Sequence, residues 1–477
     1  MLFNSFEYGA FLAGVVLIYF LLPYRFRIWL LLAASYFFYM RWQWEYVFLI
    51  VAQTLVTYEA GRRIGATENP GVRRAWLAIA VTISLGLLAY YKYANFFIDS
   101  LAPVFHAAGL GYLERHLDVI LPVGISFYTF QALSYTIDVY RRAHATEGHL
   151  GRYALYVAFF PQLVAGPIER ATHLLDQFKR RNRFDVERVI SGAKLIAWGL
   201  FKKVVIADRL AIYVDRVYAS PELWSGPTLL IATFFFAFQI YCDFSGYSDI
   251  AIGSARILGY DLMRNFRRPY FAHSITEFWK RWHISLTNWF RLYVYYPLGG
   301  NRVPYRRWLF NVFVIFILSG FWHGANWTFI MWGVLHGSYY FVESVGTRLR
   351  VGEFFEHSLT TYGARFVGIL LTFVFVLIGW IFFRSTSVEQ AFFILERILT
   401  DWDGPIYLGP SQFTTMLSVL LIGTLIIVEF FQEKGYAADY FSPSRFSTPT
   451  RWIGYVGLIL GIAMLGLSSD AFIYFQF

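Results

Sequence analysis

The sequence predicts an all-α, polytopic integral membrane protein with about 10–13 membrane-embedded helices, including re-entrant segments, that enclose a tunnel or funnel. Of its 477 residues, 57% are hydrophobic and only 15% are charged, whereas roughly 25% of the residues in an ordinary soluble domain carry a charge. The apolar residues form blocks of about 17–25, the length that crosses a hydrocarbon core roughly 30 Å thick. These observations exclude a water-soluble globule.

The chain begins with an apolar block, Phe11 to Leu22, that has no small-residue cleavage motif before Pro23, so we interpret it as a retained first span. Further apolar blocks follow near residues 28–40, 44–60, 75–98, 117–139, 153–168, 190–215, 228–258, 308–322, 325–345, 366–384, 413–431 and 452–468. The stretch from Phe159 to Pro167 is interrupted by glycine and proline. Irregular backbone survives at membrane depth only where protein or a water-filled cavity covers it, so we expect this stretch to line the interior.

Basic residues near the ends of the first spans set the expected orientation. Arginines recur at every second junction, which places those loops inside and the N-terminus outside; they are Arg25, Arg27, Arg62, Arg63, Arg73, Arg74, Arg141 and Arg142. Strict alternation fails beyond residue 150, where re-entrant helices would explain the crowding of basic clusters. No repeat interrupts the pattern, so we expect one integral membrane domain over 1–477, with N-terminal spans in 1–115, a catalytic core in 116–347 and C-terminal spans in 348–477.

The charge pattern and the cysteine count exclude several function classes. The net charge is +10, but the basic residues lie in short runs between apolar blocks, which favours topology signals and anionic lipid or ligand contacts over nucleic-acid binding. The single cysteine, Cys242, excludes an internal disulfide and a cysteine-rich zinc site. The chain has no GxSxG, HExxH, P-loop or GxGxxG motif, so serine hydrolases, metalloproteases and ATP-driven pumps lose their usual support.

The stretch 276–291 is rich in tryptophan and basic residues. Placed on one helix, it brings four side chains into a single polar stripe: Lys280, His283, Thr287 and Arg291. Two interpretations stay open. The helix could be an ordinary interfacial one whose basic side chains reach outward, or the stripe could line a path for an anionic ligand with His283 inside it.

A second histidine stretch covers 319–327, between two apolar runs. An ionisable residue in such a place is a functional candidate by default, and here it is His323. Gly320 and Gly324 flank it and would allow a neighbouring helix or a substrate to approach closely. The alternative is a histidine that only bonds helices together. Asn326 would orient the ring or serve as a polar cap.

We expect structural roles for the other polar residues that lie within apolar blocks. On an ideal helix His336 is turned away from His323, so we expect the two not to share a face. A dense polar cluster lies within a long apolar block and comprises Asp243, Ser245, Ser248 and Asp249. Buried carboxylates need partners, and we expect Arg256 or the group from Arg264 to Arg268 to supply them.

With these residues identified, the chain resembles the membrane-bound O-acyltransferase superfamily, and most closely its bacterial alginate O-acetyltransferase branch. The likeness runs nearly end to end and covers residues 1–5, 122–141, 164–168, 278–291, 296–302, 319–327 and 472–477. The two histidine stretches together, about forty residues apart, carry most of its specificity. The resemblance implies that His323 is the family's catalytic histidine. It places His283 at the family's second site, where eukaryotic members commonly carry asparagine or aspartate and the bacterial branch carries histidine.

The resemblance also implies how the site would work. A neutral His323 would act as general base on an acceptor hydroxyl, while His283 or a nearby amide would polarise the thioester carbonyl. The residues expected to contact the donor are Lys280, Arg281, Arg291, Trp279 and Asn326. Further candidates for nucleotide or headgroup contact are Arg264, Arg267, Arg268, Arg302, Arg306 and Arg307. No metal ligand is expected.

The implied activity is O-acetyl transfer from a cytoplasmic donor, acetyl-CoA, across the bacterial inner membrane, for O-acetylation of an exported polysaccharide such as alginate. Acetyl-CoA would be a co-substrate, with no permanently bound cofactor. The implied partners are membrane lipid, a periplasmic or membrane-anchored acetyltransferase and a polysaccharide biosynthesis complex. Three alternatives stay open: transfer of D-alanine or another acyl group to a cell-envelope polymer, a conduit without chemistry, and a structural scaffold for an export complex.

Overall fold

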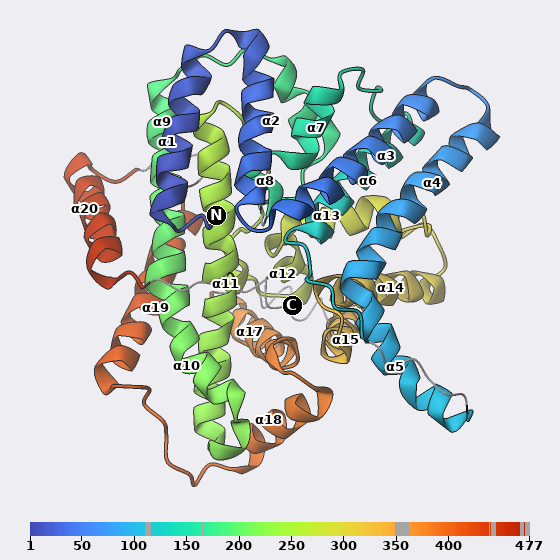
Figure 1. The fold of residues 1–477 in the computed structure, drawn as a ribbon. Coiled ribbons are helices and arrows are strands. Elements are labelled where there is room, and N and C mark those ends of the chain that lie inside the picture. The colour runs from blue at the N-terminus through green and yellow to red at the C-terminus, as the bar shows by residue number, and fades with distance from the viewer. Residues whose placement is uncertain are drawn as a thin grey trace. The chain divides into compact units, whose positions relative to one another are not determined.

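A computed structural model of the chain describes residues 1–109, 116–164, 166–348, 362–437, 439, 445–467 and 472. Every regular element in these ranges is a helix, which confirms the predicted all-α class (Figure 1). The chain divides into two compact units: unit 1 comprises 1–193 and 251–263, and unit 2 comprises 194–250 and 264–477. These two units do not test the prediction of one membrane domain with parts at 1–115, 116–347 and 348–477, which stays a prediction.

Unit 1 consists mainly of the N-terminal helices. In chain order its elements are α1 (Phe6–Leu21), α2 (Tyr24–Met40), η1 (Trp44–Tyr46), α3 (Val47–Gly65), α4 (Pro70–Leu88), η2 (Ala89–Tyr93), α5 (Ala94–Ala107), α6 (Ile125–Tyr140), α7 (Leu150–Ala158), α8 (Phe160–Leu163), η3 (Ala171–Leu175) and η4 (Gln177–Lys179). Two helices continue from one unit into the other: α9 (Val186–Leu200) and α11 (Gly226–Ile257).

Unit 2 carries both histidine stretches. Its remaining elements are η5 (Phe201–Ala207), α10 (Asp208–Ala219), η6 (Pro221–Leu223), η7 (Pro269–Phe271), α12 (Ile275–Arg281), α13 (Ile284–Phe290), η8 (Arg291–Tyr295), α14 (Tyr305–His323), α15 (Trp327–Arg348), α17 (Tyr362–Arg384), α18 (Val388–Thr400), α19 (Gln412–Glu433) and α20 (Thr448–Leu465).

Five helical segments of the described chain are long and apolar enough to cross a membrane. They are Pro70–Ala107, Gly226–Ile257, Gly363–Arg384, Gln412–Glu433 and Thr448–Leu465, and Phe6–Leu21 is a shorter apolar helix. In the most apolar part of α11, 83% of the residues are buried, whereas in α20 none is. An apolar helix in which no residue is fully buried against protein needs lipid around it. The chain is therefore a multi-pass membrane protein, with α11 in its protein interior.

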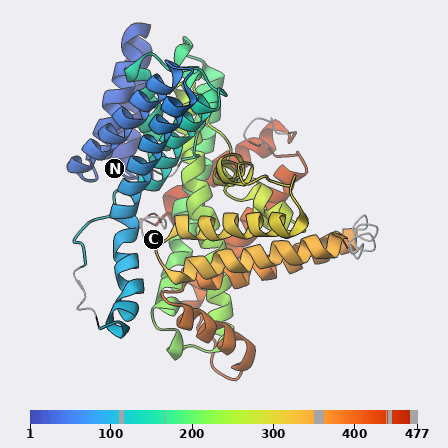
Figure 2. The same ribbon diagram turned by 90° about the vertical axis from the view of Figure 1, so that its right-hand side faces the viewer.

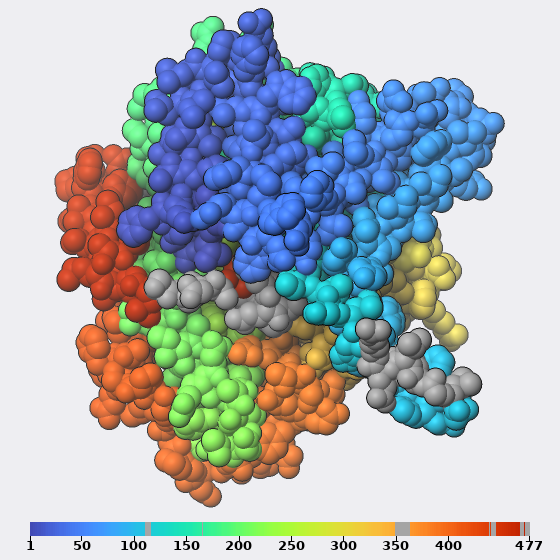
Figure 3. Space-filling view, viewed as in Figure 1, coloured from blue at the N-terminus to red at the C-terminus, as the bar shows by residue number. Residues whose placement is uncertain are grey.

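The outer face of α1 is also apolar and exposed. Figure 3 shows its side chains at the surface of unit 1, in dark blue. Leu17 and Leu21 are 63% and 74% exposed, while Tyr8 and Tyr19 on the opposite side are buried. The helix thus has one face against protein and one apolar face open to lipid.

The predicted break near Phe159 is confirmed. Helix α7 ends at Ala158, and α8 continues for only four residues from Phe160. The interrupted backbone is paired within unit 1, since the Phe160 N–H donates to the Ser35 hydroxyl at 3.0 Å. Such pairing is what lets a non-helical segment persist away from water.

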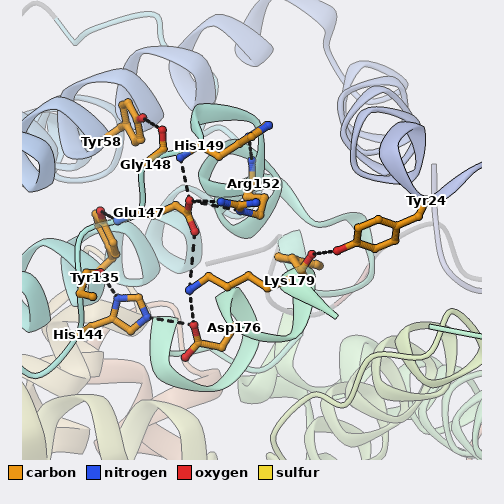
Figure 4. A network of polar contacts seen from close by, with 12 residues as sticks. Tyr24, Tyr58, Tyr135, His144, Glu147, Gly148, His149, Arg152, Asp176 and Lys179 are labelled. Carbon is orange, nitrogen blue, oxygen red and sulfur yellow. Dashed lines mark hydrogen bonds and ion pairs between the residues drawn. The ribbon is translucent and has the colours of Figure 1, made fainter. Parts of the chain in front are cut away.

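A polar network organises the loop between α6 and α7 (Figure 4). The buried Glu147 carboxylate accepts hydrogen bonds from Arg152 at 2.8 Å and from the His149 N–H at 2.8 Å. Lys179 approaches the same carboxylate to 4.0 Å and pairs with Asp176. Burial raises the pKa of the Glu147 carboxyl, but these donors outweigh burial and leave the pKa below its usual value. Glu147 therefore stays ionised and holds the loop together.

The polar cluster predicted within α11 is paired, but the predicted partners are wrong. Lys202 lies 2.7 Å from Asp249, and Lys203 lies 2.6 Å from Asp243 and 2.8 Å from Asp208. All five side chains are almost completely buried. Arg256, Arg264 and Arg268, the expected partners, instead bond Asp261, Asp439 and Glu433.

Close approach of two backbones explains this choice of partner. A Cβ added at Gly246 of α11 would lie 2.7 Å from the Gly199 carbonyl, and one added at Gly199 would lie 2.6 Å from the Gly246 carbonyl. The two glycines let α11 contact the end of α9 directly, so the lysines of η5, which follow at once, reach the carboxylates of α11.

Replacing Lys202 by methionine should destabilise unit 2, because the Asp249 carboxylate stays buried after its ion partner is lost. Removal of one member of a buried pair costs about 3–5 kcal/mol, whereas removal of both charges is often tolerated. We therefore expect Lys202→Met to lower the melting temperature of the purified protein and Lys202→Met/Asp249→Leu to recover most of that loss. A double variant no more stable than the single one would contradict the assigned pair.

Candidate active site

The helix predicted over 276–291 is interrupted, and the polar stripe is therefore wrong. Helix α12 ends at Arg281, α13 begins at Ile284, and His283 between them has a φ of 43° and a ψ of 53°. This left-handed conformation costs a residue with a side chain roughly 1–2 kcal/mol. The change in direction separates Lys280 from Thr287 and Arg291, which a straight helix would have aligned, and it turns the His283 ring into unit 2.

The start of α12 is fixed by three carboxylate and hydroxyl contacts. The Ser274 hydroxyl accepts from the Glu277 N–H at 3.1 Å, and the Glu277 carboxylate accepts from the His273 N–H at 2.9 Å. The first bond is an N-cap, and the second ties Glu277 to the residue that precedes the cap. Glu343 of α15 accepts from the Ile275 N–H at 2.8 Å. The Ser-x-x-Glu spacing was a signal in the sequence that could have predicted a helix start at this point.

The second histidine ends a helix that lies against its neighbour. Figure 2 shows α14 in yellow beside α15 in orange, and His323 is the last residue of α14. A Cβ at Gly320 would lie 2.1 Å from the Phe329 carbonyl, and one at Gly324 would lie 2.0 Å from the Phe329 ring. The prediction that these glycines permit close approach is confirmed, and the approaching element is α15.

The two histidines meet inside unit 2. His283 is 1% exposed and His323 is 3% exposed, and the centroids of their rings are 6.1 Å apart. Trp322 lies edge-on to both rings, with centroids 5.8 Å from His283 and 5.0 Å from His323. The arrangement brings together two imidazoles that are forty residues apart in sequence.

Aromatic side chains surround this pair. Phe244 of α11 lies 4.8 Å from His283, and Trp332 and Phe383 each lie 5.3 Å from His323, measured between ring centroids. No pattern in the sequence singles out these three residues, because they come from three separate helices, α11, α15 and α17. They exclude water from the imidazoles and so strengthen any electrostatic interaction with a reacting group.

Burial sets the protonation state of His283. The residue lies between two seven-residue helices, outside the five candidate spans. Loss of hydration disfavours the charged imidazolium and lowers the pKa of His283 to about 3. The ring is therefore neutral throughout the physiological pH range and presents one N–H donor and one lone pair.

His336 lies apart from the pair, on α15. His323 ends α14 and His336 belongs to α15, so the two histidines do not lie on one continuous helix, as the comparison of their directions had assumed. His336 contacts Trp279 and Trp332 at centroid distances of 5.0 and 4.9 Å. His336 and His323 contact the same Trp332 ring from two different helices, so the expectation about a shared helix face does not apply to them.

Two of the expected donor-contacting residues have other contacts. Arg281 bonds Glu277 at 2.6 Å and Glu433 at 3.0 Å, so its charge is already neutralised within unit 2. Asn326 accepts from the Thr328 N–H at 3.0 Å and donates to the Thr386 carbonyl at 3.0 Å. Of its two predicted roles, orienting the ring or capping, these bonds support the cap at the start of α15.

The other three expected donor contacts divide by exposure. Trp279 is buried, with its ring edge-on to His336. Lys280 and Arg291 are exposed, as are Arg267, Arg302, Arg306 and Arg307.

Within the ranges that the structure describes, no group of three or more histidine, cysteine or carboxylate side chains is placed to hold a metal ion.

The site can be compared with known proteins. Residues 75–389 match the model of the membrane-bound O-acyltransferase family, and this range includes both histidines. The chain belongs to this family. The resemblance drawn from the histidine stretches is confirmed, and the protein is an acyltransferase of a polytopic membrane fold.

Relatives of known name cover most of the chain. This chain is 39% identical over 427 residues to a probable alginate O-acetylase of Azotobacter vinelandii, and the alignment covers 88% of this chain and 82% of that protein. It is 36% identical to a probable alginate O-acetylase of Pseudomonas putida, over 96% of each chain. It is 35% identical to a peptidoglycan O-acetyltransferase of Helicobacter pylori, over 78% of this chain and 73% of that protein.

The left-handed backbone at His283 predicts a dependence on residue type that is separate from chemistry. Asparagine tolerates this conformation, whereas a β-branched residue does not. We expect His283→Val to melt at a lower temperature than His283→Asn, by an amount that corresponds to roughly 1–2 kcal/mol. Both variants lack the imidazole, so the comparison isolates the backbone. Equal melting temperatures would contradict the conformation assigned to residue 283.

Proposed function

We propose that this acyltransferase moves an acetyl group from cytoplasmic acetyl-CoA across the bacterial inner membrane for O-acetylation of an exported polysaccharide, with a periplasmic or membrane-anchored acetyltransferase as partner. The observation that carries the proposal is the buried, aromatic-walled pair of His283 and His323, 6.1 Å apart. The names of the relatives, alginate O-acetylase and peptidoglycan O-acetyltransferase, support acetyl as the group and a polymer as the final acceptor.

In the proposed reaction His323 acts as general base. Its neutral imidazole takes the proton of an acceptor hydroxyl as the hydroxyl oxygen attacks the carbonyl carbon of the thioester. A C–O bond forms and the C–S bond breaks, and the proton then passes from the imidazolium to the departing thiolate of coenzyme A. The acceptor hydroxyl belongs to the polysaccharide or to the partner that delivers the acetyl group to it.

His283 stabilises the charge that develops on the carbonyl oxygen. A neutral imidazole can donate one N–H bond to an oxyanion, and such a donor is strongest where aromatic side chains exclude water. The rigid turn around His283 fixes the ring before the reaction begins, so no reorganisation is needed in the transition state. In this scheme His323 acts on the attacking hydroxyl, and His283 acts on the carbonyl oxygen of the same thioester.

The donor's phosphates would be held by exposed basic residues of unit 2. Lys280 lies in the last turn of α12, three residues before His283, and Arg291 follows α13; both side chains are exposed. Arg281 is a weaker candidate for direct contact because Glu277 and Glu433 already neutralise it. Arginine and lysine bind phosphate by charge-assisted hydrogen bonds, and a multiply charged donor cannot cross lipid, so its nucleotide would stay at the cytoplasmic surface.

His323→Ala tests the proposed base. General-base catalysis contributes typically about 10²–10⁴ in rate, so we expect acetyl transfer from labelled acetyl-CoA to fall by that factor at equal membrane abundance. His336→Ala is the matched control, since it removes another fully buried histidine of unit 2. We expect this control to lower the melting temperature while folded molecules keep most of their turnover. Transfer by His323→Ala at the wild-type rate would contradict the proposal.

The same assay separates the proposed enzyme from its alternatives. Purified protein with its partner receives labelled acetyl-CoA or a labelled D-alanyl donor in parallel. An enzyme transfers acetyl in a manner that depends on His323, whereas a conduit or scaffold binds without turnover and is indifferent to the substitution. Transfer of D-alanine in preference to acetyl would keep the catalytic pair but overturn the proposed donor.

A further inference from the structure

Asn265 lies beside the His283 turn and is completely buried. Its backbone carbonyl accepts a hydrogen bond from the Ile284 N–H at 2.9 Å. Its side-chain oxygen accepts from the Ser285 N–H at 3.3 Å and from the Ser285 hydroxyl at 3.0 Å. Its side-chain amide donates to the Ser248 hydroxyl of α11 at 3.4 Å. One residue thus receives the first two N–H groups that follow His283.

These bonds replace an ordinary helix cap. The first N–H groups of a helix lack partners within the helix, and the N-cap side chain normally supplies one. The N-cap of α13 is His283, whose side chain makes no capping hydrogen bond. Asn265 supplies the missing acceptors from a different part of the chain, so the His283 ring is released from the capping role and can face His323.

The neighbouring backbone completes the arrangement. The Arg267 N–H donates to the Arg281 carbonyl at 2.8 Å, on the other side of His283 from Ile284. The segment 265–267 therefore holds the chain immediately before and immediately after the turn. A residue in the left-handed region persists only when its surroundings determine it, and this segment provides that determination.

We propose that Asn265 is a positioning residue for His283: its side-chain oxygen fixes the start of α13 and with it the direction in which the His283 imidazole points. The inference rests on the proposed function of the His283–His323 pair and names a third residue on which that pair depends. Asn265 touches neither donor nor acceptor in this role. It acts only through the geometry of His283.

The test compares two substitutions of Asn265. Asn265→Asp keeps the side-chain acceptor but loses the amide donation to Ser248 and buries a carboxyl group, so we expect a lower melting temperature with a kcat well above that of the leucine variant. Asn265→Leu has similar size and no side-chain acceptor, so the Ser285 N–H loses its partner while the backbone carbonyl of residue 265 still accepts from Ile284. A misplacement of about 1 Å can cost roughly 10²-fold in rate, so we expect the leucine variant to lose about 10²-fold in kcat with the KM for acetyl-CoA unchanged.

Asn311→Leu is the matched control. Asn311 is a second completely buried asparagine of unit 2, and it donates to the carbonyls of Leu298 and Gly300. Its substitution removes the same chemistry from a place with no part in the turn. We expect it to lower the melting temperature and to leave kcat per folded molecule near the wild-type value. Equal losses of kcat in the two leucine variants would overturn the proposal.

A double-mutant cycle tests whether Asn265 acts through His283. In a His283→Ala background, Asn265→Leu should cause no further loss of turnover, because the ring that it positions is gone. A full additional loss in that background would overturn the proposal. If Asn265→Leu does not accumulate, Asn265→Ala takes its place. Failure of both variants to fold would assign Asn265 to folding and would also overturn a role specific to His283.

The outcomes separate this inference from the proposed function. Wild-type turnover in His283→Ala would remove the role of His283 itself, whatever the Asn265 variants do. A large loss in His283→Ala together with normal turnover in Asn265→Leu would leave the proposed function intact and overturn only the positioning role.

Discussion

The candidate site depends on one interruption of the helical backbone, at Trp282 and His283. A helix that continued through this point would satisfy its own N–H and C=O groups and would carry His283 past His323. The observed turn leaves those groups to be satisfied from elsewhere, which buried backbone requires. The segment 265–267 supplies the partners. The backbone strain at His283 is thus maintained by hydrogen bonds and places an imidazole where a helix would not.

The ion pairs of α11 and the aromatic wall of the site belong to one arrangement within unit 2. Lys202 and Lys203 bind carboxylates at positions 249 and 243 of α11, and Phe244, which contacts His283, is the next residue after Asp243. Buried ion pairs contribute little net stability, but loss of one partner is costly, so α11 must keep its carboxylates against the lysines. The rotation of α11 that satisfies the lysines also presents Phe244 to His283, so charge pairing and the packing around the His283 ring depend on the same helix position.

The sequence was sufficient for features that depend on composition or on a single residue type. Helical class, membrane residence, the break near Phe159 and the close approach at Gly320 follow from hydropathy, proline and the absence of a Cβ. The turn at His283 did not follow, because the hydrogen bonds that maintain it come from Asn265 and have no local pattern. The partners of Asp243 and Asp249 were mistaken for the same reason: the contact between Gly199 and Gly246 that brings the lysines near is a property of the packed helices.

The most direct test of this account is the energetic coupling between the two imidazoles, measured as acetyl transfer by His283→Ala, His323→Ala and the double variant under single-turnover conditions. Groups that act on one transition state are strongly non-additive. The account predicts that the double variant is scarcely slower than His323→Ala alone. Losses that simply multiply in the double variant, at unchanged protein abundance, would contradict a site in which the two rings act together.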